Sequence, residues 1–120
     1  MTGSIAVIGS GNIAKDHINA IQQVGRCNIA YVYGSDLDRA AALAALAPGA
    51  VPTTDLNVIL ADPAVKAVNV CNATPDHARF TVAAGKAGKH VHVEKPAALN
   101  LHDLDSMIDA TEGRGLTLTV

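Results

Sequence analysis

The chain has 120 residues, the usual size of a single domain with one hydrophobic core. Nearly half of its residues are apolar and only three are aromatic, so Ala, Val, Ile and Leu must form the core, as is common where helices pack on a sheet. A formal net charge of -2, without any Lys or Arg cluster, argues against the basic surface that nucleic-acid binding requires.

Short apolar runs alternate with amphipathic helical segments, which is typical of a parallel sheet covered on both faces. The first half predicts strands at 4–8, 29–33 and near 51, separated by helices over 13–24 and 37–46. The second half predicts a helix over 55–60, a strand at 67–71, a helix ending at Gly88, a strand at 90–93, a last helix and a strand at 116–120. We therefore expect one doubly wound α/β domain over residues 1–120, with a mostly parallel six-stranded sheet.

The spacing of apolar residues also predicts the face that each helix buries. We expect the buried faces to contain Ile13, His17, Ala20, Ile21 and Val24 in the first helix; Phe80, Ala83, Ala84 and Ala87 in the fourth; and Leu101, Leu104, Ile108 and Thr111 in the last.

A glycine-rich turn joins the first strand to the first helix, in the sequence Gly9-Ser10-Gly11-Asn12-Ile13-Ala14. This G-x-G-x-x-A pattern, in a strand-turn-helix context, is typical of a Rossmann dinucleotide site. Gly9 permits the sharp turn, Gly11 lets the backbone approach a pyrophosphate, and Ala14 allows close packing of helix on strand. The alternative is an ordinary strand-to-helix turn. A nucleoside triphosphatase loop is excluded, because the required Lys and Ser/Thr are missing.

The end of the second strand bears on the choice between NAD and NADP. An acidic residue there usually binds the adenosine ribose, but Gly34 occupies the first loop position. Gly34 leaves room for a 2'-phosphate, which Ser35 and Arg39 are placed to bind, so we favour NADP. Two alternatives stay open: Asp36 reaches the ribose, which favours NAD, or Asp36 and Asp38 only cap the next helix.

Four features of the sequence point to one protein family. These are the glycine turn, His17, and the two later segments Ala73-Thr74-Pro75-Asp76-His77 and Gly88-Lys89-His90-Val91-His92-Val93-Glu94-Lys95-Pro96. In all four the sequence resembles the Gfo/Idh/MocA oxidoreductase family. The resemblance covers the chain from 4 to 120. It implies that Thr74 and Pro75 lie under the nicotinamide ribose and that Glu94 lies beside the nicotinamide. It implies that Lys95 is the catalytic residue, contacting the reacting hydroxyl or carbonyl, and that the following proline is commonly cis. The cofactor-binding positions expected in this part of the chain are Asn72, Ala73, Thr74, Pro75, His77, Glu94 and Lys95, in addition to Gly9, Ser10, Gly11, Asn12, Ile13, Gly34, Ser35 and Arg39.

Two features depart from the family pattern. The interval from Pro75 to the helix carrying Phe80 is shorter than usual, and no counterpart of the family's substrate domain is present. The family therefore implies the nicotinamide-cofactor domain of an oxidoreductase acting on a sugar, polyol or related hydroxyl compound. We expect this chain to bind NAD(P) without efficient turnover, because a small-molecule substrate would need the missing domain.

The remaining candidates have simpler interpretations. His17 lies on the inward face of a helix, where a packed histidine is expected rather than a catalytic one. His90 and His92 alternate along a strand, but no third ligand is near, so no metal site is expected. Cys27 and Cys71 form no motif and are expected to be reduced thiols.

A glycine-rich first turn also occurs in proteins of other functions. A stand-alone nucleotide-binding or regulatory module acting with a partner would use the same residues, and an S-adenosylmethionine methyltransferase would leave Glu94-Lys95-Pro96 unexplained. No segment approaches the roughly 20 apolar residues of a membrane helix, so we expect a cytoplasmic protein without membrane association. Exposed apolar surface makes a homo-oligomer plausible.

Overall fold

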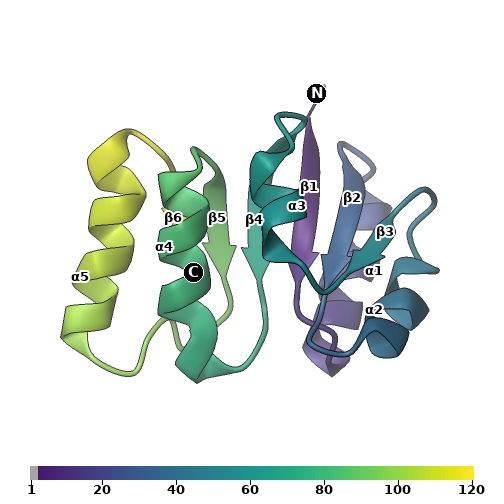
Figure 1. The fold of residues 1–120 in the computed structure, drawn as a ribbon, viewed down its shortest axis with the longest axis horizontal. Helices are drawn as coiled ribbons and strands as arrows, with labels where there is room; N and C mark the ends of the chain where they lie inside the picture. Colours follow the sequence, from purple (N-terminus) through teal and green to yellow (C-terminus); the bar gives the residue numbers. More distant parts are fainter. Residues whose placement is uncertain (1–2) are drawn as a thin grey trace.

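The apolar runs of the sequence form six strands in the computed structural model, which describes residues 3–120 (Figure 1). The strands are β1 (Ser4–Ile8), β2 (Asn28–Tyr33), β3 (Val51–Thr53), β4 (Val65–Val70), β5 (His90–Val93) and β6 (Leu118–Thr119). The α-helices between them are α1 (Asn12–Val24), α2 (Leu37–Ala44), α3 (Leu56–Ala61), α4 (His77–Lys86) and α5 (Leu101–Ala110). Short 3-10 turns at Thr74–Asp76 and Glu112–Arg114 precede α4 and follow α5.

All six strands are parallel and lie in the order β3-β2-β1-β4-β5-β6. The chain builds one half of the sheet outward from β1 and then returns to place β4 on the other side of β1. Loops that follow β1 and β4 therefore diverge from neighbouring strands, and this divergence opens a crevice at the carboxyl ends of the strands. The predicted doubly wound Rossmann sheet is confirmed.

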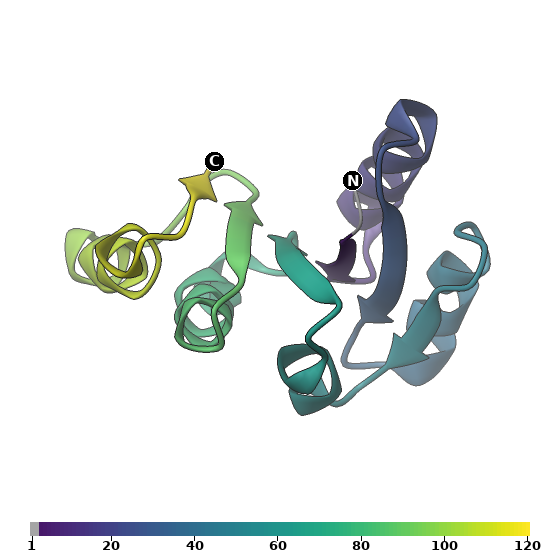
Figure 2. The ribbon, with the colours of Figure 1, turned by 90° about the horizontal axis from the view of Figure 1, so that it is seen from above.

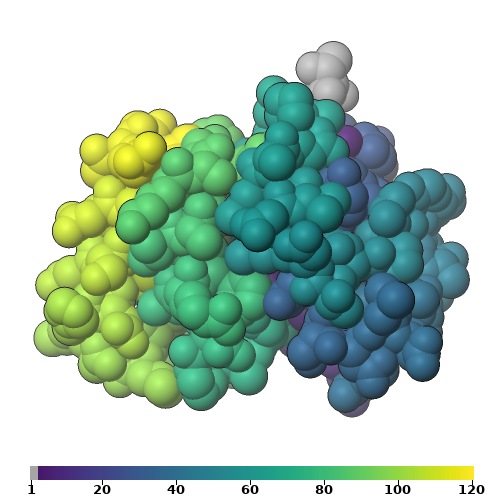
Figure 3. Space-filling model, in the orientation of Figure 1, coloured from purple at the N-terminus to yellow at the C-terminus, as the bar shows by residue number. Residues whose placement is uncertain are grey.

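Helices cover both faces of the sheet because successive strand residues point to opposite sides. On one face, Val70 and Val93 pack with the buried side chains of α3, α4 and α5, including Phe80 and Met107. On the other face, Val7 packs with the buried side chains of α1 and α2. Figure 2 shows α1 and α4 on opposite sides of the sheet, and Figure 3 shows the continuous outer surface of α3, α4 and α5.

The predicted helix faces are partly wrong. In α1 the fully buried residues are Ala14 and Ile18, whereas Ile13 and Val24 are exposed. The small Ala14 side chain lets α1 approach the sheet closely, and this sets the rotation of the helix. The predicted faces also contained Ala20 and Ala87, which the structure places in solvent.

The last helix is rotated away from its predicted orientation. Leu101 and Ile108 are exposed, while Met107 and Ala110 are buried together with Thr111. Because α5 packs against α4 rather than lying flat on the sheet, its contact stripe is shifted from the one that a sheet-facing helix would use (Figure 1).

Several element boundaries differ from the prediction, and three of them have a clear structural reason. The last strand has two residues rather than the five of 116–120, because it forms a ladder only with β5, where Val91 pairs with Leu118. The fourth strand spans Val65–Val70 rather than 67–71, since Val65 already pairs with Ser4. Helix α2 ends at Ala44 and continues to 46 only as a turn. Within residues 3–120, every helix is too short or too polar to cross a bilayer.

Candidate functional site

A cleft of about 390 Å³ lies at the carboxyl ends of the central strands, where the topology opens the crevice. Eight predicted cofactor-binding residues line it: Gly9, Ser10, Gly11, Gly34, Ser35, Arg39, Asn72 and Ala73. Five further lining residues were not predicted to belong to the site: Tyr33, Cys71, Asp76, Arg79 and Phe80. Three connections of the chain therefore meet at one cavity.

Gly9 forms the floor of the cleft and is held between two strand ends. Its N–H donates to the carbonyl oxygen of Tyr33 at 2.8 Å, and its φ of +138° is a conformation that residues with a side chain rarely adopt. A Cβ at this position would lie 2.8 Å from the carbonyl oxygen of Cys71. Both the backbone conformation and the close approach of β4 therefore require glycine.

Gly11 plays a different part, because nothing lies within 4 Å of the position that a Cβ would take. It is the N-cap residue of α1, in extended conformation, and no side chain caps the helix. The first turn of α1 also carries no acidic residue. An uncapped helix start with free N–H groups and a positive dipole end favours an anion.

The second connection brings Gly34 against the glycine turn. A Cβ on Gly34 would lie 2.8 Å from Oγ of Ser10, so the Ser10 side chain fills part of the room that Gly34 leaves. Asp36 caps α2: its Oδ1 accepts from the N–H groups of Asp38 at 2.9 Å and Arg39 at 3.2 Å. The capping interpretation of Asp36 is thus confirmed, while the Arg39 side chain lines the cleft and forms no ion pair within the described part of the chain.

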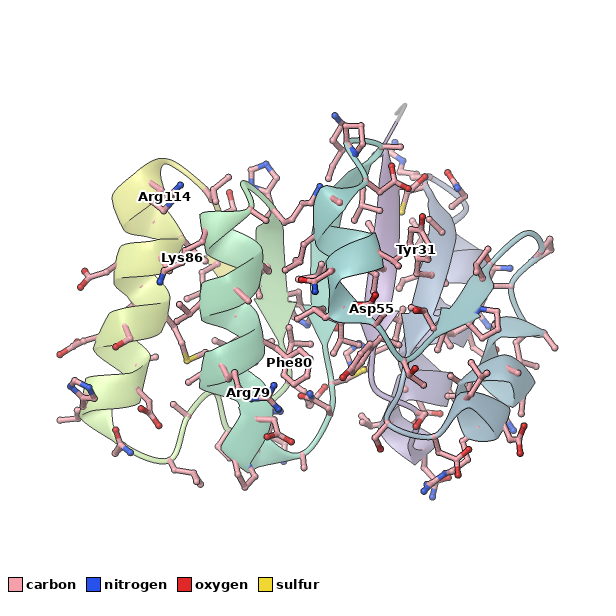
Figure 4. All side chains as sticks on the ribbon, in the orientation of Figure 1. Tyr31, Asp55, Arg79, Phe80, Lys86 and Arg114 are labelled. Carbon is pink, nitrogen blue, oxygen red and sulfur yellow. The ribbon has the colours of Figure 1, made fainter. Side chains whose placement is uncertain are left out.

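Aromatic rings form one wall of the cleft. The rings of Tyr33 and Phe80 lie 5.3 Å apart at centroids, and Cζ of Arg79 lies 4.4 Å from the centroid of Phe80 (Figure 4). Phe80 was predicted to be a core residue, and it is buried, although it also lines the cleft. Arg79 directly precedes Phe80, the inward-facing residue of α4. This position was the one sequence signal that Arg79 lies next to the cleft.

The connection after β4 divides between the cleft and the outer surface. Asn72 and Ala73 line the cleft, and Oδ1 of Asn72 is buried without a hydrogen-bond partner. Thr74 and Pro75 form a 3-10 turn, and Pro75 lines a groove between α4 and α5 instead. An unpartnered acceptor beside the cleft is a group that a bound ligand can satisfy.

His77 is buried and does not line the cleft. Its Nδ1 lies 2.9 Å from the carbonyl oxygen of Pro96, and its Nε2 lies 2.9 Å from that of Asn72. Both partners are acceptors, so each contact is a hydrogen bond only where the facing nitrogen carries a proton. His77 thus joins the loop after β4 to the loop after β5.

Glu94 and His17 form the closest polar contact between distant parts of the chain. His17 Nε2 lies 2.6 Å from Glu94 Oε2, and the Asn69 amide donates to His17 Nδ1 at 2.8 Å. The hydrogen bond from His17 lowers the pKa of the Glu94 carboxyl below its usual value of 4.5, against the raising effect of burial. The prediction that His17 is a packed, satisfied histidine is confirmed.

Lys95 follows β5 at the same edge of the sheet. It is exposed, it does not line the cleft, and its ammonium has no hydrogen bond or ion pair among residues 3–120. The Lys95–Pro96 peptide bond is cis, as the resemblance implies. Asn12 and Ile13 lie in the first turn of α1 and are exposed beside the cleft rather than lining it.

The arrangement can bind an anion on the backbone of the glycine turn and a planar group against the aromatic wall. Two cations, Arg39 and Arg79, and one carboxylate, Asp76, line the cleft. Among residues 3–120, His, Cys, Asp and Glu side chains nowhere gather in a group of three or more that would hold a metal ion.

Comparison with known proteins places this geometry in context. The model of the oxidoreductase family with an NAD-binding Rossmann fold, GFO_IDH_MocA, matches residues 4–120. The myo-inositol 2-dehydrogenase of Thermotoga maritima is 33% identical over 108 residues, which are 90% of this chain and 32% of that protein. Inositol 2-dehydrogenase 3 of Saccharopolyspora erythraea is 38% identical over 120 residues, covering 98% of this chain and 35% of that protein.

Solved structures agree with this likeness. GenD2 from gentamicin A biosynthesis, in complex with NAD, superimposes with a TM-score of 0.92 at 29% identity, over 98% of this chain and 33% of that one. The WlbA dehydrogenase of Bordetella pertussis, in complex with NADH and UDP-GlcNAcA, gives a TM-score of 0.89 at 27% identity, over 98% and 35%. The chain spans about a third of the length of the curated relatives it matches.

Proposed function

The chain belongs to the Gfo/Idh/MocA family of oxidoreductases and has the family's NAD-binding Rossmann fold, and from that premise we propose that its cleft holds a nicotinamide dinucleotide by the diphosphate. The observation that carries the proposal is the open backbone at Gly11, where the uncapped first turn of α1 faces the cleft. Side chains are absent where a diphosphate would approach, and the helix dipole favours its charge. A net acidic domain therefore needs no lysine at this point.

The other cleft residues fit the two halves of such a cofactor. Ser10 lines the cleft next to the diphosphate position, Asn12 and Ile13 follow it in the first turn of α1, and Asn72 lines the cleft where a ribose would lie. The adenosine half belongs beside Gly34, Ser35 and Arg39, at the end of β2. The nicotinamide half belongs toward the 3-10 turn with Thr74 and Pro75 and toward Glu94, with His77 holding the two loops together.

We favour NADP over NAD as the ligand of this chain. The first loop position after β2 is Gly34, which has no charge to repel a 2'-phosphate. The carboxylate of Asp36 is engaged in capping α2, and the guanidinium of Arg39, which has no ion pair among residues 3–120, lines the cleft. A planar, permanently charged guanidinium suits bidentate binding of a phosphate.

The activity that we propose for the family member containing this domain is hydride transfer between the nicotinamide and a carbon of a sugar, polyol or related hydroxyl compound. Lys95 would polarise the substrate oxygen, because its exposed ammonium has no ion pair within the described residues 3–120 and follows β5 at the cofactor edge of the sheet. Most substrate contacts would come from residues beyond this domain, so the 120 residues alone should bind cofactor but oxidise a polyol very slowly.

Calorimetric titration of the chain with NADPH and NADH tests the proposal. We expect saturable binding of both, tighter for NADPH, with the preference reduced by Arg39→Gln. S-adenosylmethionine is the negative control, because the site is built for a diphosphate. Lack of heat with either dinucleotide at millimolar concentration would overturn the proposed function, and tighter binding of NADH would overturn the preference for NADP.

A further inference from the structure

We propose that Arg79 stacks its guanidinium on the adenine base of the bound dinucleotide, with the opposite face of the guanidinium resting on Phe80. This inference rests on the proposed function and adds to it a residue from α4 that binds the base. Neither the glycine turn nor the loop after β2 contributes a planar side chain at this point of the cleft.

The position of Arg79 supports this role. It lies in the first part of α4, and the cleft is lined by Arg79 on one side and by Arg39, Gly34 and Ser35 on the other. Figure 4 shows Arg79 and Phe80 side by side near the end of α4 that adjoins the carboxyl edge of the sheet. A base lying between the end of β2 and the start of α4 would therefore lie within reach of the guanidinium.

The Arg79 guanidinium contacts Phe80 and is otherwise largely open to solvent. Its Cζ lies over the Phe80 ring at 4.4 Å from the ring centroid, within the range of a cation–π contact. Phe80 is only 3% exposed and is held by the Tyr33 ring, so the surface under Arg79 is fixed. The Arg79 side chain is itself 68% exposed, which leaves its outer face available to a second planar group.

The only ion pair of Arg79 among the described residues does not compete strongly with a ligand. Arg79 Nη2 lies 3.3 Å from Oδ1 of Asp76, and both side chains are largely exposed. Exposed pairs of this kind contribute little free energy, so the guanidinium can adjust to a base at small cost. The carboxylate also offsets part of the charge of Arg79, which favours stacking on a neutral base over pairing with a phosphate.

The experiment compares wild type with Arg79→Lys, Arg79→Gln and the control Lys86→Gln by calorimetry with NADH and with ADP-ribose. Lys86 is an exposed cation on the same helix, and it lines the groove between α4 and α5 rather than the cleft. Since a stacked base contributes at least about 1 kcal/mol, we expect both Arg79 variants to weaken NADH and ADP-ribose about fivefold or more. Lys86→Gln should change neither affinity by more than about twofold.

The lysine variant separates stacking from charge. Lysine keeps the positive charge but lacks the plane, so full retention of affinity in Arg79→Lys would overturn the stack. A second measurement follows the Nε–H proton of Arg79 by NMR, which should shift upfield when ADP-ribose binds. Absence of binding by wild type would overturn both proposals. Wild-type binding with unchanged Arg79 variants would overturn the stack alone.

Discussion

Separate alanine substitutions at Gly9 and Gly11 should divide the folding role of the glycine turn from its binding role. The two positions lie two residues apart in one turn, yet their surroundings differ completely. A Cβ on Gly9 would lie 2.8 Å from a backbone carbonyl oxygen, whereas a Cβ on Gly11 would meet nothing within 4 Å. Gly9→Ala should therefore damage the fold, and Gly11→Ala should damage binding.

The size of the Gly9→Ala effect follows from two costs. An alanine at φ of +138° costs about 1–3 kcal/mol in backbone strain. Overpacking against the carbonyl group of Cys71, a residue whose N–H donates to the carbonyl oxygen of Ile8 at 2.9 Å, adds about 1–3 kcal/mol. The sum of about 2–6 kcal/mol corresponds to a fall in Tm of about 8–24 °C, since a domain of this length loses about 4 °C per kcal/mol.

For Gly11→Ala the contributions to stability nearly cancel. Alanine is a poorer N-cap residue than glycine by a fraction of a kcal/mol, but it lowers the entropy of the unfolded chain by a similar amount. The conformation at Gly11, with φ of −91°, is accessible to alanine. Stability should change by less than about 0.5 kcal/mol, while the methyl group keeps the diphosphate from the backbone and reduces NADPH affinity by about tenfold or more.

Urea unfolding followed by circular dichroism measures the stability, and calorimetry with NADPH measures the affinity. The two variants serve as controls for each other, because each should change one quantity strongly. A Gly11→Ala variant that binds NADPH as tightly as wild type would contradict the binding role of Gly11. A Gly9→Ala variant that unfolds at the wild-type urea concentration would contradict the folding role of Gly9.

Three further predictions follow from individual side chains. His17→Leu removes the donor to Glu94, whose lowered pKa contributes stability that is present above pH 4.5 and lost as pH falls. Urea unfolding should therefore give a free energy of unfolding about 1 kcal/mol below that of wild type at pH 7, with a smaller difference below pH 4.5. His17→Gln should retain part of the wild-type stability. Burial and the nearby Glu94 raise the pKa of the Cys71 thiol to about 12. Mass spectrometry after iodoacetamide treatment at pH 8 should therefore show label on Cys27 alone in the native chain and on both thiols in urea. Rapid labelling of Cys71 in the native chain would contradict this. Asp36→Asn keeps the helix cap, so thermal stability and NADPH affinity should stay at or slightly above the wild-type values. Asp36→Ala should lower the free energy of unfolding by about 1 kcal/mol. A clear loss of NADH affinity in Asp36→Asn would show that the carboxylate reaches the ribose.

The strands and the glycine turn could be predicted because their signals are local. A run of apolar residues between turn residues indicates a buried strand wherever it pairs, and Gly9 and Gly11 lie within three residues of each other. The rotation of each helix was less predictable, since α5 carries apolar residues on two faces and its packing partner decides which is buried. Leu101 is exposed and Met107 buried because α5 packs against α4.

Contacts between distant parts of the chain lay beyond the sequence reasoning. His17 and Glu94 are 77 positions apart in the sequence. They can pair only because α1 reaches across to β4, the strand next to β5. Membership of Arg79 in the cleft likewise depends on β4 lying beside β1, which brings the start of α4 to the glycine turn. Such residues become candidates only when the strand order is known.

The segment 88–96 carries one lysine at each end of β5, and the two lysines have different surroundings. Lys89 precedes β5, is only 5% exposed, and donates from Nζ to the carbonyl oxygen of Asp62 at 2.7 Å, fixing the end of α3. Glu94 and Lys95 follow the same strand at its carboxyl end, which is the edge of the sheet where the cleft opens, although neither residue lines the cleft. A four-residue strand thus connects a buried lysine that holds the scaffold to an exposed lysine for which we propose a role in binding. Substitution at Lys89 should therefore lower stability first, and substitution at Lys95 should leave stability unchanged.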